Sequence, residues 1–84
     1  MEQIKRTGVI SIIIHKRKES AMKVNEILYK YGECIVGRMG IPHGPDGTHV
    51  IAVIVNANTD IIGAMTGKLG SIPDVEVSSA ITKL

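Results

Sequence analysis

Residues 50–55 read V-I-A-V-I-V, and residues 9–14 read V-I-S-I-I-I. Alternate side chains of a strand point to opposite faces of its sheet, so both stretches predict strands that are apolar on both faces. Such strands belong in the centre of a sheet. Because two helices can cover only one face of a small sheet, the second apolar face predicts an interface with another copy of the chain; the alternative is a monomer with a partly exposed sheet face.

A helix is expected after the first of these strands. Its apolar stripe has helical spacing, Ser20 is the expected N-cap, and Gly32 the expected stop. The stripe consists of Val24, Ile27, Leu28 and Tyr31.

A second helix is expected after residues 49–55, with Asn58 or Thr59 as its N-cap and Gly70 at its end. Gly63 and Gly67 lie in its interior, where each glycine costs about 1 kcal/mol relative to alanine. We therefore expect this face of the helix to pack closely on the sheet or on another subunit.

The remaining segments complete a repeated pattern. Residues 34–41 predict a strand, residues 42–47 a turn-rich loop, and residues 75–82 a half-buried last strand with alternating polarity. The order strand–helix–strand–strand–helix–strand predicts an α+β, ferredoxin-like βαββαβ sandwich with a four-stranded antiparallel sheet and two helices on one face. We expect residues 1–84 to form a single domain.

Composition narrows the function classes. The formal charge of +2 and the presence of only two aromatic residues argue against nucleic-acid binding. Cys34 is the one cysteine, which excludes an internal disulfide and favours a reducing, cytoplasmic setting. The longest apolar run is too short to span a membrane, so no membrane association is expected.

The residue types used for catalysis and metal binding do not form a known sequence motif in this chain. The sequence has no nucleophile motif and no paired carboxylates on one element, so we expect no enzyme activity. His15, Cys34, His43 and His49 are possible metal ligands, and His43 and His49 are the closest pair. Their spacings match no local metal motif, so no metal and no cofactor is predicted, although convergence in three dimensions remains an alternative.

Two groups of residues could bind a small ligand. Residues 15–18, H-K-R-K, lie beside the start of the first helix, where an anion could bind; the alternative is that these side chains extend into water. Arg38 lies between Gly37 and Gly40, which allow a ligand to approach the backbone; the alternative is a surface charge on an edge strand.

The chain resembles a known family over almost its whole length. Residues 23–32 (K-V-N-E-I-L-Y-K-Y-G), 35–42 (I-V-G-R-M-G-I-P), 64–73 (A-M-T-G-K-L-G-S-I-P) and 75–80 (V-E-V-S-S-A) resemble the iron-only ([FeFe]) hydrogenase system regulators. That family is similar in fold to ACT domains and to the C-terminal domain of the nickel-responsive repressor. The resemblance implies a non-catalytic, ACT-like regulatory domain associated with hydrogenase-maturation proteins.

The resemblance also implies where a small effector would bind, at the end of the first strand and beside a neighbouring subunit. The ligand-binding candidates are His15, Lys16, Arg17, Gly37, Arg38 and Gly40. ACT domains that bind amino acids usually carry a glycine in the loop where this chain has K-R-K, which argues against an amino-acid effector. The chain does not reproduce the repressor's nickel ligands and lacks its DNA-binding domain, so direct DNA binding is not expected.

The leading hypothesis is a homo-oligomer that senses a small ligand or contacts hydrogenase-maturation proteins. A metal-binding protein and a pure protein–protein interaction module are the alternatives.

Overall fold

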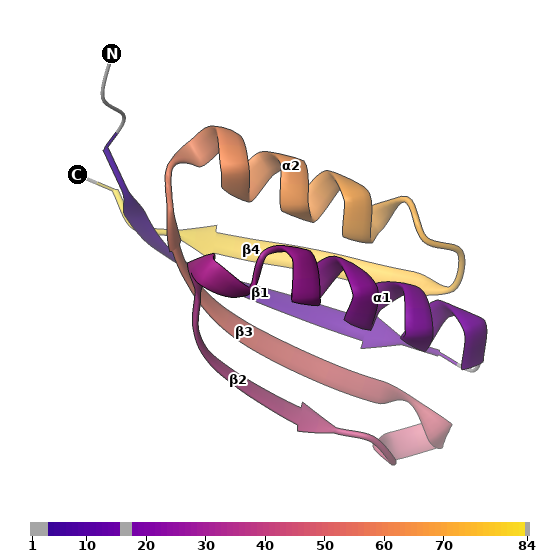
Figure 1. Cartoon of the computed structure of the whole chain (residues 1–84). Coiled ribbons are helices and arrows are strands. Elements are labelled where there is room, and N and C mark those ends of the chain that lie inside the picture. Colours follow the sequence, from indigo (N-terminus) through magenta and orange to yellow (C-terminus); the bar gives the residue numbers. More distant parts are fainter. Residues whose placement is uncertain (1–3, 16–17, 84) are drawn as a thin grey trace.

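The computed structural model describes residues 4–15 and 18–83, in which helices and strands follow the predicted order (Figure 1). Single turns of 3-10 helix precede the second strand (η1, Gly32–Cys34) and the third (η2, Pro45–Gly47). The main elements are β1 (Arg6–Ile14), α1 (Lys18–Lys30), β2 (Ile35–Ile41), β3 (His49–Ala57), α2 (Thr59–Gly70) and β4 (Val75–Ile81).

The strands form one antiparallel sheet in the order β2-β3-β1-β4. Figure 1 shows both helices on the same face of this sheet. The predicted ferredoxin-like fold is therefore confirmed, with the two doubly apolar strands in its centre. The start of β1 and the end of β4 are neighbours, since the Thr82 amide donates to the Thr7 carbonyl at 2.9 Å.

The core lies between the helices and one face of β1 and β3. Each central strand contributes alternate residues, and each helix contributes the apolar stripe that faces the sheet. The fully buried large side chains are Ile10, Ile12, Ile14, Val24, Leu28, Ile51, Val53, Val55, Ile62, Met65 and Leu69.

Ser20 does not cap the first helix, contrary to the sequence prediction. α1 begins at Lys18, so Ser20 lies inside its first turn and is only 3% exposed. Its hydroxyl donates to the Pro73 carbonyl at 2.6 Å, which ties α1 to the turn between α2 and β4. In α2, Asn58 is the cap, and its side-chain oxygen accepts from the Ile61 amide at 2.9 Å.

Gly63 and Gly67 do not pack closely on the sheet. Both are exposed on α2, and an added Cβ would meet nothing within 4 Å at either position. The expectation of tight packing against the sheet is wrong, because the side of α2 that faces the strands is formed by Ile62, Met65 and Leu69.

Replacing Gly63 or Gly67 with alanine should stabilise the chain. Each substitution should raise the free energy of unfolding by up to about 1 kcal/mol, because alanine loses less backbone entropy in a helix and has room here. Urea unfolding followed by circular dichroism measures the change. Gly47→Ala is the matched control and should destabilise, since Gly47 has φ +75°. A loss of stability in both helix variants would contradict an open environment on this face.

Ser20→Ala should lower the free energy of unfolding by about 1 to 3 kcal/mol, because it leaves the part-buried Pro73 carbonyl without its donor. Ser79→Ala, at an exposed position of β4, is the control and should change stability little. Equal unfolding midpoints for the two variants would show that the Ser20–Pro73 bond contributes nothing.

Candidate functional site: the open sheet face and the histidine end

The sheet has one face without helices, called here the open face. According to the strand register, each of the four strands places three residues on this face. They are Val9, Ser11 and Ile13 of β1; Val50, Ala52 and Ile54 of β3; Gly37, Met39 and Ile41 of β2; and Glu76, Ser78 and Ala80 of β4. Val9 is 45% exposed, Ile54 44%, Ile41 51% and Met39 71%, so large apolar side chains remain in contact with water.

The two halves of the open face differ in the size of their side chains. Met39, Ile41 and Ile54 are large, exposed apolar side chains on β2 and β3. On β1 and β4, Ser11, Ser78 and Ala80 are small, and a hollow of about 160 Å³ lies over this half. This hollow is lined by Val9, Ser11, Ser78, Ser79 and Ala80.

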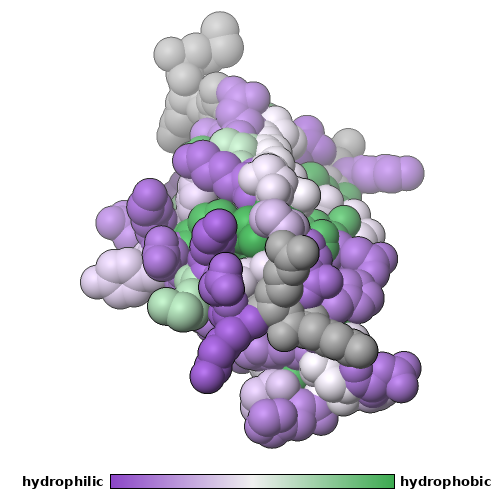
Figure 2. All heavy atoms as spheres, turned by 90° about the vertical axis from the view of Figure 1, so that its right-hand side faces the viewer, coloured by the Kyte–Doolittle hydropathy of each residue, from purple (hydrophilic) through white to green (hydrophobic). Residues whose placement is uncertain are grey.

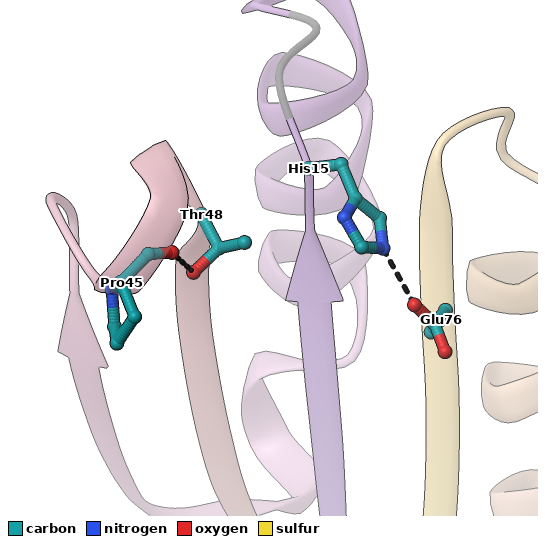
Figure 3. A network of polar contacts seen from close by, with 4 residues as sticks. All are labelled: His15, Pro45, Thr48 and Glu76. Atoms are coloured by element: carbon teal, nitrogen blue, oxygen red, sulfur yellow. Dashed lines mark hydrogen bonds and ion pairs between the residues drawn. The ribbon is translucent and has the colours of Figure 1, made fainter.

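Charge on the open face lies at one end. His15 follows the last residue of β1, and its Nε2 lies 2.5 Å from Oε2 of Glu76 on β4. Figure 3 shows the His15 ring directed from the tip of β1 toward Glu76. Both side chains are substantially exposed, so this pair contributes little to stability. The middle of the open face carries uncharged side chains only.

Arg38 lies on the other side of the sheet. It is paired in register with Val53, whose side chain is buried beneath the helices. The Arg38 guanidinium donates to Oδ1 of Asn25 on α1 at 2.6 Å. Together with Tyr29 and Ile35 it lines a groove of about 510 Å³ between α1 and β2.

The ligand-binding candidates therefore do not form one site. Gly40 lies on the helix side with Arg38, whereas Gly37 is paired with Ile54 on the open face. His15 is at the end of the sheet and lines a different hollow from Arg38. Lys16 and Arg17 lie outside the described residues.

Three histidines gather at the end of the sheet where β1 stops and α1 and β3 start. This hollow, called here the histidine end, measures about 350 Å³. Figure 2 looks onto this end of the molecule, where hydrophilic side chains dominate and hydrophobic surface is visible between them. The lining residues are Ile14, His15, Lys18, Ala21, Pro42, His43, Gly47 and His49.

Sequence reasoning identified His43 and His49 as a pair but missed the grouping with His15 and Lys18. The signal lay in the antiparallel topology, since Ile14 at the end of β1 is the register partner of His49 at the start of β3. The end of a strand and the start of its antiparallel neighbour must meet, which brings His15 to the same edge.

A tightly bonded loop carries two of these histidines. The Gly44 amide donates to the Thr48 carbonyl at 2.6 Å. The Thr48 hydroxyl donates to the Pro45 carbonyl at 2.7 Å (Figure 3). Asp46 and Gly47 have φ of 57° and 75°, the left-handed conformation that closes the turn. The loop therefore holds His43 and His49 at its two ends in a fixed arrangement.

The four possible metal ligands do not converge. Cys34 lines a hollow at the opposite end of the sheet, together with Lys5, Asn56 and Asn58. Within residues 4–15 and 18–83, no group of three or more His, Cys, Asp or Glu side chains is arranged to hold a metal ion. Among the helices of the described chain, none has the length and apolar character needed to cross a membrane.

The fold and its faces define the class as a small ferredoxin-like α+β domain with one helical layer and one uncovered apolar sheet face. The chain belongs to the TM1266-like family, described as "Iron-only hydrogenase system regulator, putative", whose model matches residues 6–79. No curated protein matches the sequence.

Solved structures share this fold. The uncharacterized protein TM1266 from Thermotoga maritima is 33% identical, with a TM-score of 0.89 over 94% of this chain and 99% of that one. The C-terminal domain of the MgtC protein from Mycobacterium tuberculosis is 12% identical, with a TM-score of 0.72 over 98% and 93%. An unknown protein from Galdieria sulphuraria is 15% identical, with a TM-score of 0.68 over 95% of this chain and 46% of that one. The last two similarities concern the fold alone.

Proposed function

We propose that the chain is a non-catalytic regulatory domain of an iron-only hydrogenase system, and that it works as a homo-oligomer assembled through its open face and senses a small ligand. Membership of the regulator family supports the regulatory part. The observation that carries the oligomeric part is the apolar open face, where Met39, Ile41, Ile54 and Val9 remain exposed.

The free energy of covering this face is substantial. Fully burying one such side chain is worth about 1.5 to 3 kcal/mol, and these four are roughly half exposed. Covering them is therefore worth on the order of 3 to 6 kcal/mol per chain, and two chains gain it twice. That gain is comparable to the roughly 4 to 15 kcal/mol that association costs in lost freedom of motion.

The distribution of large and small side chains on the open face favours a second copy of the chain as the partner that covers it. A two-fold dimer places the same patch of both chains in contact. The large side chains of Met39, Ile41 and Ile54 can then pack toward the hollow of about 160 Å³ over Ser11 and Ser78 of the other copy, and the reverse. The absence of charge in the middle of the face fits this arrangement, because no charged group would be buried unpaired.

In this function the domain would act in the cytoplasm, on hydrogenase-maturation proteins or in response to a small effector. A pure protein–protein interaction module stays as the second candidate, supported by the same open face. No arrangement of the described side chains favours the metal-binding alternative.

Ile54→Glu should convert the wild-type dimer, or higher oligomer, into a monomer, because it would bury a carboxylate without a partner. Native mass spectrometry and light scattering measure the subunit count. Tyr29→Glu is the matched control; Tyr29 is 88% exposed on α1, away from the open face, and its replacement should leave assembly intact. Ser78→Phe, which fills the hollow without adding charge, should weaken assembly in the same direction.

Circular dichroism checks that the Ile54→Glu monomer stays folded. A wild-type chain that is monomeric at micromolar concentration would overturn the oligomeric part of the proposal. The regulatory part is tested in cells with an iron-only hydrogenase system, where deletion of the chain should change hydrogenase activity and the Ile54→Glu variant should fail to restore it. Unchanged activity after deletion would overturn the regulatory role.

A further inference from the structure

We propose that the histidine end binds a small organic anion, whose carboxylate or phosphate group faces Lys18, His43 and His49 while its carbon skeleton lies on Ile14 and Ala21. This inference rests on the proposed function, because it names the class of ligand that the regulatory domain would sense. It concerns a different place from the open face and from the Arg38 groove.

The polar side chains that line this hollow all offer nitrogen. Lys18 provides a full positive charge, and each imidazole of His43 and His49 provides an N–H donor. No carboxylate is among the lining residues. Hydrogen bonds from charged or N–H donors to an anionic oxygen are the strong class of such bonds, so the chemistry of the lining selects an anion.

His15 belongs to the same lining but already has a partner. Its ring contacts Glu76 on the open-face side, and its backbone amide donates to the Asp74 carbonyl at 3.0 Å. Glu76 is therefore engaged with His15 and does not line the hollow. Glu19 and Asp46 are close in sequence to the lining residues, yet neither is part of the lining.

Size and polarity indicate an organic ligand. The volume of about 350 Å³ lies at the lower end of the range for small-molecule sites, which is roughly 300 to 1,000 Å³. Ile14, Ala21 and Pro42 supply apolar surface beside the nitrogen donors. A bare inorganic ion would leave that apolar surface in water, whereas a ligand with a short carbon chain would cover it.

The backbone that carries two of the donors is already held in place. The loop from Gly44 to Thr48 is closed by its own hydrogen bonds, and a Cβ added at Gly44 would come within 3.0 Å of the Thr48 carbonyl oxygen. The backbone that carries His43 and His49 therefore has little freedom to lose when a ligand binds, which reduces the cost of binding.

The same lining disfavours two other ligands. An α-amino acid carries an ammonium group, which would meet Lys18 with no carboxylate in the lining to balance it. A metal ion needs several ligands at short, common distances, and the described residues include no such group of three.

Titration with succinate, a four-carbon dicarboxylate, tests the site. In ¹H–¹⁵N NMR spectra of the full chain, succinate should shift the amides around Lys18, His43 and His49, and neutral succinamide should not. Lys18→Met and His49→Gln should each weaken binding roughly tenfold or more, the loss expected for one charge-assisted hydrogen bond. Lys30→Met, at the other end of the same helix, is the matched control and should bind like the wild type.

Inorganic phosphate and Zn²⁺ complete the experiment. Phosphate should bind more weakly than succinate, because it cannot cover Ile14 and Ala21. Overturning results are equal binding of phosphate and succinate, tighter binding of Zn²⁺ than of either anion, unchanged succinate binding in both variants, or no binding at all. Native mass spectra of the same samples separate the two proposals, since a failed titration with an intact oligomer contradicts only the anion site.

Discussion

One geometric constraint organises this molecule: two helices cover one face of a four-stranded sheet whose central strands are apolar on both faces. Burying Ile10, Ile12 and Ile51 beneath the helices forms the core. The same alternation leaves Val9 and Ile54 on the opposite side, exposed to water. Antiparallel sheets with one face in water commonly carry polar residues on that face. Exposure of the second apolar face to water is thus unfavourable in free energy for the isolated chain, and covering that face would remove this exposure.

The alternation along β1 also links the open face to the histidine end. Val9, Ser11 and Ile13 face away from the helices, and His15 continues that series one step beyond the strand. Its ring contacts Glu76 of β4, and it also lines the hollow beside Lys18. A ligand that shifted this ring would act on the end of the open face through one contact. The proposed ligand site and the proposed assembly surface are thus joined by the geometry of a single strand.

The sequence was sufficient for features that depend on periodicity. The two apolar strands, the apolar stripe of the first helix and a cap at Asn58 or Thr59 all follow from local patterns; the structure confirms the strands and the stripe and places the cap at Asn58. Features that depend on a three-dimensional approach were missed. Ser20 was predicted to cap the first helix from its place in the sequence. Its hydroxyl instead donates to the carbonyl of Pro73, which is 53 residues away. The pairing register of β2 shifts between Ile35 and Gly37, and this shift determines which face of the sheet Arg38 occupies. The position of Arg38 on the helix side was not predicted from the sequence. The histidine end required knowing which strand termini meet.

The neighbouring ends of β1 and β4 have a consequence for how such a domain can be combined with others. The Thr82–Thr7 hydrogen bond brings the two ends of the fold together, at the opposite end of the sheet from the histidines (Figure 1). A fold whose two chain ends lie close together can be inserted into a loop of another protein with little disturbance to that protein. For the same reason it tolerates circular permutation. The Galdieria sulphuraria protein, in which this fold matches under half of the chain, shows the same architecture within a longer polypeptide. The fold is thus suited to insertion into other proteins, with its histidine end left free of the point of attachment.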